Sequence, residues 1–204
     1  MSIKAIIFDY GNVISLPQDP QVLDELAKKA GADRLLFESL LWSTRKEYDR
    51  GTISVQEYYK NLFSRLAVTV DDKTMDEMIT MDLESWKNIN TGTTALMDDV
   101  KRAGYILGIL SNIPHDFLSW ARKSVPVFTL AQVGLFSCEV GLIKPEPEIY
   151  QALISRCGIE AEELVFFDDN PDNIRSAASM GIHAFLWKSP EDARRELLSL
   201  GVGL

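Results

Sequence analysis

Two apolar runs in the chain each lead into acidic residues. Residues 3–8 are almost continuously apolar and are followed by Asp9. Residues 164–167 form a second run, which ends on Asp168 and Asp169. Such runs, bounded by turn residues, are typical of strands that are buried on both faces in a parallel sheet covered by helices. The acids are therefore expected at the carboxyl ends of two strands, where open α/β sheets bind their ligands.

Residues 16–88 carry helix signals and no convincing strand pattern. Asp19, followed by a proline, is suited to open a helix. Ser54 and Glu57 have the spacing of a capping box at the start of an amphipathic helix. A further helix is expected over about residues 71–82. The whole segment is therefore predicted to be a helical insertion directly after the first strand.

From residue 91 onward, helix and strand patterns alternate. The expected elements are a helix over 91–103, a strand over 105–110, a helix over 113–124, a short strand at 135–137, a helix ending at residue 157, a helix over 172–180 and a strand over 183–186. Strands separated by single helices predict a doubly wound parallel α/β sheet, Rossmann-like in its layering. We expect residues 1–15 and 89–204 to form this core domain and residues 16–88 to form a helical cap domain.

Composition narrows the range of partners. The chain has 204 residues, of which 46% are hydrophobic, and a formal net charge of −9. This acidic balance disfavours nucleic acid and anionic membranes, whereas a small anionic substrate remains compatible with a local metal and a few placed cations. A core strand at the start leaves no room for a signal peptide, and no apolar run reaches the roughly 18 residues of a membrane span. Cys138 and Cys157 are expected to be reduced thiols, so a cytoplasmic protein is predicted.

Four strand ends or following loops carry polar groups. For any one of them alone, a turn, a helix cap or a solvated loop residue is the favoured explanation. Together they supply a nucleophile, donors for phosphate oxygens, a cation and carboxylates for Mg²⁺, which are the parts of phosphoryl transfer. The residues concerned are Asp9, Ser111, Asn112, Lys144, Asp168 and Asp169.

These motifs resemble those of the haloacid dehalogenase superfamily along the whole chain. The matching pieces are residues 8–13 (Phe-Asp-Tyr-Gly-Asn-Val), 110–112 (Leu-Ser-Asn), 141–150 (beginning Gly-Leu-Ile-Lys-Pro) and 167–173 (Phe-Asp-Asp-Asn-Pro-Asp-Asn). The helical insertion matches the type of cap that this superfamily carries after its first motif. Residues 48–54 are similar to a cap segment of the epoxide-hydrolase phosphatase domain and bacterial glucose-1-phosphate phosphatase branch.

The resemblance implies a role for each motif residue. Asp9 would be the nucleophile that takes the phosphoryl group, and Ser111 with the backbone of Asn112 would hold phosphate oxygens. Lys144 would balance the charge on the nucleophile and the phosphate. Mg²⁺ would be held by Asp9 and by Asp169, with Asp168 acting directly or through water; Asn173 would orient this loop.

Arg45 and Tyr48 are candidate substrate-binding residues in the insertion. The alternative for Tyr48 is a place in the helical core, because aromatics at helical spacing are usually core residues. The alternative for Arg45, at even odds, is a solvated helix charge.

The chain departs from the superfamily pattern at Gly11. Most phosphatases of this superfamily have a second aspartate there, which protonates the leaving group and later activates water. The backbone carbonyl of Gly11 can still bind the metal, but the acid is missing. The glucose-1-phosphate phosphatase branch shares the Gly-Asn-Val sequence at this point, so the change does not by itself imply an inactive protein.

The expected function is a Mg²⁺-dependent phosphatase that acts on a small phosphorylated metabolite, with a sugar phosphate as one candidate, through an aspartyl-phosphate intermediate. We expect no nucleic acid or membrane partner, and a monomer or homodimer. One alternative is a non-catalytic or weakly active phosphate-binding protein. The other is a 2-haloacid dehalogenase, which is disfavoured because the dehalogenase tyrosine lies two residues beyond the nucleophile, whereas Tyr10 is adjacent to Asp9.

Overall fold

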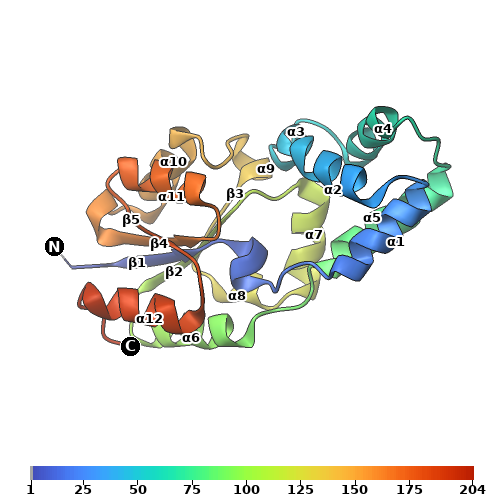
Figure 1. Cartoon of the computed structure of the whole chain (residues 1–204). Coiled ribbons are helices and arrows are strands. Elements are labelled where there is room, and N and C mark those ends of the chain that lie inside the picture. Colours follow the sequence, from blue (N-terminus) through green and yellow to red (C-terminus); the bar gives the residue numbers. More distant parts are fainter. Residues whose placement is uncertain (1) are drawn as a thin grey trace.

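A parallel sheet forms the centre of the protein (Figure 1), whose computed structural model describes residues 2–204. Within these residues the sheet has five strands in the order β3-β2-β1-β4-β5. They are β1 Ala5–Phe8, β2 Ile106–Ser111, β3 Val133–Phe136, β4 Leu164–Asp168 and β5 His183–Leu186. Every residue of β1 and β4 is buried, which explains their continuously apolar sequences. The predicted doubly wound α/β fold is confirmed.

Alternate residues of β1 face two helical layers. Ile6 and Phe8 pack in one hydrophobic cluster with α6, α7 and α12, whereas Ala5 and Ile7 pack in another with α10 and α11. Figure 1 shows α6 and α12 on one side of the sheet and α10 and α11 on the other. These helices span Thr91–Arg102 (α6), His115–Ser124 (α7), Pro147–Cys157 (α10), Pro171–Ser179 (α11) and Pro190–Ser199 (α12).

The remaining helical elements are short or belong to the insertion. The insertion contains α1 Pro20–Ala30, α2 Arg34–Ser43, α3 Lys46–Asp49, α4 Val55–Leu66 and α5 Asp72–Ser85. Single turns lie at Tyr10–Ile14 (η1), Val127–Leu130 (α8), Ser137–Val140 (α9) and Ala161–Glu163 (η2). In the described part of the chain, no helix combines the length and the apolar character needed to cross a membrane.

Local capping signals place several helix ends. The Asp19 side chain accepts a hydrogen bond from the Gln21 N–H (2.9 Å) at the start of α1. Both halves of the Ser54–Glu57 capping box form at the start of α4.

The structure corrects two expectations: β3 begins at Val133, because its pairing with β2 extends to that residue, and α12 was not expected at all.

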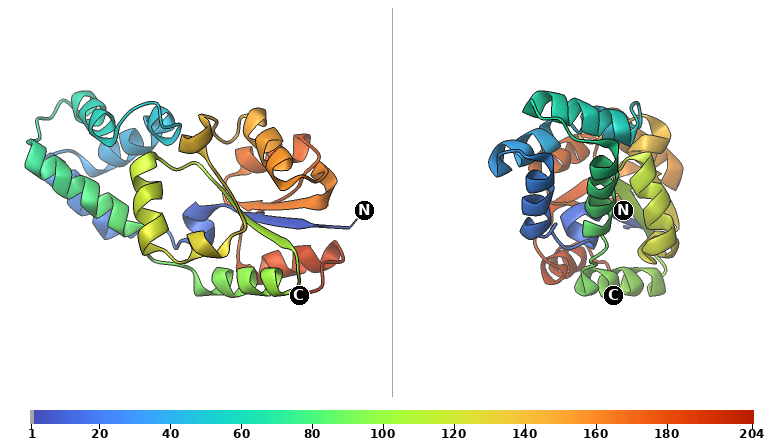
Figure 2. Two further views of the ribbon diagram at one scale, coloured as in Figure 1. Left: turned by 180° about the vertical axis from the view of Figure 1, so that it is seen from behind. Right: turned by 90° about the vertical axis from the view of Figure 1, so that its right-hand side faces the viewer.

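The insertion has a hydrophobic cluster of its own. Leu26, Phe37, Leu41 and Met78 belong to this cluster, and α1 and α5 lie against each other. Figure 2 shows these helices beyond the end of the sheet that is opposite the N-terminus. The segments through which the chain enters and leaves the insertion are hydrogen-bonded to each other, since the Leu16 N–H donates to the Asn88 carbonyl at 2.8 Å. We retain the division into 1–15 with 89–204 and 16–88 as a proposal.

The α3 region is tied to the sheet by polar contacts. Arg50 donates to both carboxylate oxygens of Glu146, at 2.6 and 3.0 Å, and to the Gly141 carbonyl at 2.8 Å. The Ser137 hydroxyl donates to the Asp49 carbonyl at 2.5 Å. These contacts hold the insertion above the carboxyl ends of the strands.

Candidate active site

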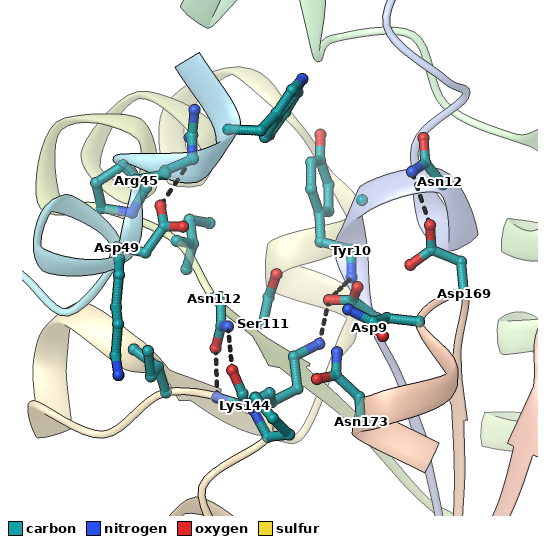
Figure 3. Close-up of a pocket in the computed structure, with 18 of the residues that line it drawn as sticks. Asp9, Tyr10, Asn12, Arg45, Asp49, Ser111, Asn112, Lys144, Asp169 and Asn173 are labelled. Carbon is teal, nitrogen blue, oxygen red and sulfur yellow. Dashed lines mark hydrogen bonds and ion pairs between the residues drawn. The ribbon is translucent and has the colours of Figure 1, made fainter. Parts of the chain in front are cut away.

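A cavity of about 630 Å³ lies where the strand ends meet the insertion (Figure 3). The chain runs from β1 outward to β3 and then places β4 on the other side of β1, so the direction of the sheet reverses between β1 and β4. Ligands of open α/β sheets bind at such a switch point. Asp9 follows β1, and Asp168 is the last residue of β4. The topology thus brings Asp9 and the Asp168–Asp169 pair to the same edge of the sheet.

The loop after β1 is held in an unusual conformation. Asp9 accepts a hydrogen bond from the Tyr10 N–H at 2.7 Å, and the Ser15 N–H closes the following turn onto the Tyr10 carbonyl at 2.8 Å. Asn12, rather than Gly11, has a positive φ of 58°, and asparagine tolerates this left-handed region better than most residues. The Asn12 amide donates to Asp169 Oδ2 at 2.8 Å, so the first loop is linked to the fourth motif.

Lys144 is the buried cation of the site. Its Nζ lies 2.8 Å from Asp9 Oδ1, 2.5 Å from Asp168 Oδ2 and 3.2 Å from the Leu110 carbonyl oxygen, and the residue is 4% exposed. The Asn112 side chain accepts from the Lys144 N–H at 2.8 Å and donates to the Lys144 carbonyl at 2.9 Å. The Asn112 side chain therefore clamps this loop.

Asp168 is saturated by donors of the protein. The Asn170 N–H and the Asn173 amide donate to its Oδ1 at 2.8 and 2.9 Å, and Lys144 with the Asn173 amide reaches its Oδ2. Asp168 has no exposed surface. It therefore orients Lys144, and its carboxylate is less free than the other two to hold an ion directly.

The electrostatics of the site call for positive charge. Burial, together with the charges of Asp168 and Asp169, raises the pKa of Asp9 to about 7, against the lowering effect of Lys144. Burial alone would lower the pKa of Lys144, but the charges of Asp168 and Asp9 outweigh it and raise that pKa. One lysine thus faces three carboxylates.

The three carboxylates form a group that could bind a metal ion. One oxygen each of Asp9, Asp168 and Asp169 lies within 4.8 Å of the others. Among residues 2–204, no hydrogen bond reaches Asp9 Oδ2 or Asp169 Oδ1. Hard divalent cations such as Mg²⁺ prefer carboxylate oxygens, so the donor set fits such an ion. Gly11 also lines the cavity.

Ser111, at the end of β2, lies on the cavity wall and is 4% exposed. None of the described residues makes a hydrogen bond to its hydroxyl, and Figure 3 shows this side chain between Asp9 and Asn112. The hydroxyl is thus available to a ligand that occupies the cavity.

The two candidates from the insertion differ in position. Arg45 lines the cavity and donates from Nε to Asp49 Oδ1 at 2.9 Å. Tyr48 is not part of the cavity wall: its ring stacks on Tyr58 with centroids 4.5 Å apart, and its hydroxyl donates to Asp116 at 2.7 Å. The helical core therefore accounts for Tyr48, and we do not propose it as a substrate contact.

The cavity also contains residues that the sequence analysis did not single out. Asp49 and Trp86 line it, and Asn12 links two of its loops. The spacing of four between Arg45 and Asp49 is the signal for a helical ion pair and could have identified Asp49. Trp86 had no comparable signal, because its place depends on how α5 returns to the sheet.

Replacing Lys144 by methionine is expected to lower the free energy of unfolding by about 3 kcal/mol or more, because two buried carboxylates lose their cation. Urea unfolding in metal-free buffer measures this change. Lys4→Met, which removes a surface pair between the exposed Lys4 and the partly buried Glu163 at 2.8 Å, is the control and should cost less than about 1 kcal/mol. Equal changes in the free energy of unfolding for the two substitutions would contradict the stabilising role assigned to Lys144.

A family model described as haloacid dehalogenase-like hydrolase matches residues 3–181. The chain belongs to this family. Bifunctional epoxide hydrolase 2 of Mus musculus is 43% identical to this haloacid dehalogenase-like hydrolase. The match covers 97% of this chain but only 38% of that relative's length. Phosphatase MT3486 of Mycobacterium tuberculosis is 25% identical, and the match covers 98% of this chain and 96% of the relative.

Solved structures of the family agree with the fold. A magnesium complex of a HAD family enzyme from Bacteroides thetaiotaomicron has a TM-score of 0.73 and 25% sequence identity, and the match covers 94% of this chain and 96% of that chain. The predicted family and hydrolase class are therefore confirmed.

Proposed function

We propose that this hydrolase removes phosphate from a small phosphorylated metabolite through an aspartyl-phosphate on Asp9. The observation that carries the proposal is the position of Asp9: its carboxylate lies at the base of the cavity, 2.8 Å from the Nζ of the buried Lys144 and beside Asp169. A full-length relative named as a phosphatase supports the same reaction class.

The reaction has two steps. A carboxylate oxygen of Asp9 attacks phosphorus, the bond from phosphorus to the ester oxygen breaks, and the leaving oxygen takes a proton from solvent water to become an alcohol. Water then attacks the phosphorus of the acyl phosphate and gives up a proton to solvent, and the bond from phosphorus to the Asp9 oxygen breaks, which releases inorganic phosphate and returns the Asp9 carboxylate. Lys144, the Ser111 hydroxyl and the Asn112 N–H would stabilise negative charge on the phosphate oxygens during both steps.

We propose Mg²⁺ as the cofactor. Asp9 and Asp169 would hold it, with the Gly11 carbonyl and Asp168 completing its surroundings directly or through water. When bound, it would offset the charge of the carboxylates and of the incoming phosphate. The donor chemistry of the three acids and the magnesium complex of the Bacteroides thetaiotaomicron enzyme support this choice.

A panel of phosphate monoesters in Mg²⁺ buffer, with release of inorganic phosphate as the readout, tests the proposed function. Release from at least some esters is expected. The same protein incubated with 2-chloropropionate, with release of chloride as the readout, tests the dehalogenase alternative. Absence of phosphate release from every ester would overturn the proposal and return the non-catalytic alternative to consideration.

Gly11→Asp is expected to raise kcat on alkyl phosphates by about 10-fold or more, because it supplies the acid that a poor leaving group needs. The backbone tolerates the change: Gly11 has φ −64° and ψ 130°, and an added Cβ would meet the Trp86 ring at 4.0 Å, an ordinary contact. Aryl phosphates, whose leaving groups need little help, should gain less.

Gly11→Asn is the matched control for this prediction, because it has the same size and no acidic proton. Its rate on alkyl phosphates should not rise. An equal gain from both substitutions, or no gain from Gly11→Asp when chemistry limits the rate, would mean that another group already acts as the acid.

A further inference from the structure

The cavity wall formed by the insertion contains an ion pair that is largely withdrawn from water. Arg45 Nε donates to Asp49 Oδ1 at 2.9 Å, as Figure 3 shows, and the two side chains are only 13% and 14% exposed. Both residues line the same cavity as Asp9. Burial, opposed by the charge of Arg45, raises the pKa of Asp49 to about 6, so the carboxylate is ionised at neutral pH.

This pair leaves hydrogen-bonding groups unused. A guanidinium has five N–H donors, and here only Nε has a hydrogen-bond acceptor within residues 2–204. Arg45 Nη1 is enclosed without a partner, whereas Nη2 is not enclosed. No described residue donates to Asp49 Oδ2. Arg45 Nη2 and Asp49 Oδ2 are not enclosed, so both are open to a molecule that occupies the cavity.

Each cation of this wall has an acidic side chain close to it. Arg45 faces two acids, since its Nη1 also lies 4.0 Å from Asp82 Oδ2. Lys46 Nζ, the other cation of this wall, lies 3.7 Å from Glu146. A second anionic group on a substrate would therefore find no cation without an acid beside it, and it would approach the Asp49 carboxylate.

A hydroxyl group is complementary to this pair, because it can donate to Asp49 Oδ2 while it accepts from Arg45 Nη2. Two tryptophans provide apolar surface beside it: the rings of Trp42 and Trp86 meet edge to face with centroids 6.0 Å apart, and the Arg45 guanidinium lies 5.3 Å from the centre of the Trp42 ring. Carbon-bound hydrogens of a polyhydroxylated chain or ring pack well against such surfaces.

We infer that Arg45 and Asp49 are specificity-determining residues, which select phosphate monoesters with a neutral, hydroxylated distal group and reject those with a distal carboxylate or second phosphate. The inference rests on the proposed function, because it places the phosphate of the substrate beside Asp9. The cavity volume of about 630 Å³ lies within the range of small-molecule sites and leaves space for such a group beyond the phosphate.

The test compares glycerol 3-phosphate with 3-phosphoglycerate, which differ at the distal carbon in having a hydroxymethyl group or a carboxylate. In the wild type, kcat/KM should favour glycerol 3-phosphate by about 10-fold or more. Asp49→Asn should lower this ratio by about 10-fold, because Arg45 is then free to pair with the carboxylate. Arg45→Gln should lower kcat/KM for glycerol 3-phosphate without any gain for 3-phosphoglycerate.

Glu38→Gln is the matched control, because Arg34 and Glu38 form an ion pair of the same spacing (2.7 Å) on α2 outside the cavity. Its substrate ratio should equal that of the wild type. If Asp49 had a purely structural role, its substitution would change kcat/KM for both substrates by the same factor and leave the ratio of the two values unaltered. An unaltered ratio in Asp49→Asn, or a wild type that prefers 3-phosphoglycerate, would overturn the inference.

A binding experiment distinguishes a failure of this inference from a failure of the proposed function. In the Asp9→Asn protein, calorimetric titration with the two esters should show the same preference for glycerol 3-phosphate without turnover. If the wild type hydrolyses no ester but this preference is present, the phosphatase proposal fails and the selectivity stands. If the wild type hydrolyses esters but neither binding nor kcat/KM depends on the distal group, the selectivity fails and the phosphatase proposal stands.

Discussion

Asp9→Asn is expected to lower kcat by more than about 10³-fold, because an amide is not a nucleophile. The fold should survive: the amide oxygen can still accept from the Tyr10 N–H and from Lys144, which bond the same carboxylate oxygen in the native protein. Phosphate release measures the loss of activity, and urea unfolding checks that the variant is folded.

Asp172→Asn is a suitable control for this substitution, since Asp172 is an exposed acid of α11 that does not line the cavity. It should keep nearly the full rate. In the wild type, beryllofluoride, which imitates a phosphoryl group on aspartate, should appear on Asp9 in a crystal structure. An Asp9→Asn protein with more than a tenth of the native rate would place the nucleophile elsewhere.

Removal of divalent cations with EDTA is expected to reduce phosphate release to background, and added Mg²⁺ should restore it. Without a cation, the charges of Asp9, Asp168 and Asp169 repel one another and the incoming phosphate, and Lys144 alone opposes them. The pKa of Asp9, raised to about 7 mainly by burial, also leaves a large share of this carboxyl protonated at neutral pH. A bound cation lowers this pKa and so favours the ionised nucleophile.

Asp169→Asn should raise the Mg²⁺ concentration that gives half-maximal activity by about 10-fold or more, because a neutral amide replaces an exposed carboxylate ligand. The increase in melting temperature caused by Mg²⁺ should shrink in parallel, which provides a readout without turnover. Asp172→Asn again serves as the control. Undiminished activity in excess chelator would refute the metal assignment.

The sequence alone was sufficient to predict the layers of the fold and the edge of the sheet at which the acids gather. Strands buried on both faces, such as β1 and β4, must be apolar at nearly every position, so they are visible as continuous runs. The acids that follow these runs then lie at one edge, since parallel strands share their direction. Helix starts at Asp19 and Ser54 were equally accessible, because a cap is formed by residues within one turn. The start of α12 has a similar local signal at Ser189, whose side chain accepts from the Asp192 N–H.

Contacts between distant segments determine which side chains of the insertion reach the cavity. Arg45, Tyr48 and Asp49 lie within five residues of one another, yet Arg45 and Asp49 line the cavity while Tyr48 packs in the helical core. Their directions follow from contacts with residues far away in the sequence, such as the hydrogen bonds of Tyr48 to Asp116 and of the Asp49 carbonyl to Ser137. The same holds for the loop of Lys144, which Asn112 clamps across 32 positions of the chain. Local sequence patterns fix the period of an element, whereas the orientation of one element against another depends on packing between distant segments, and the set of side chains that lines the cavity depends on that orientation.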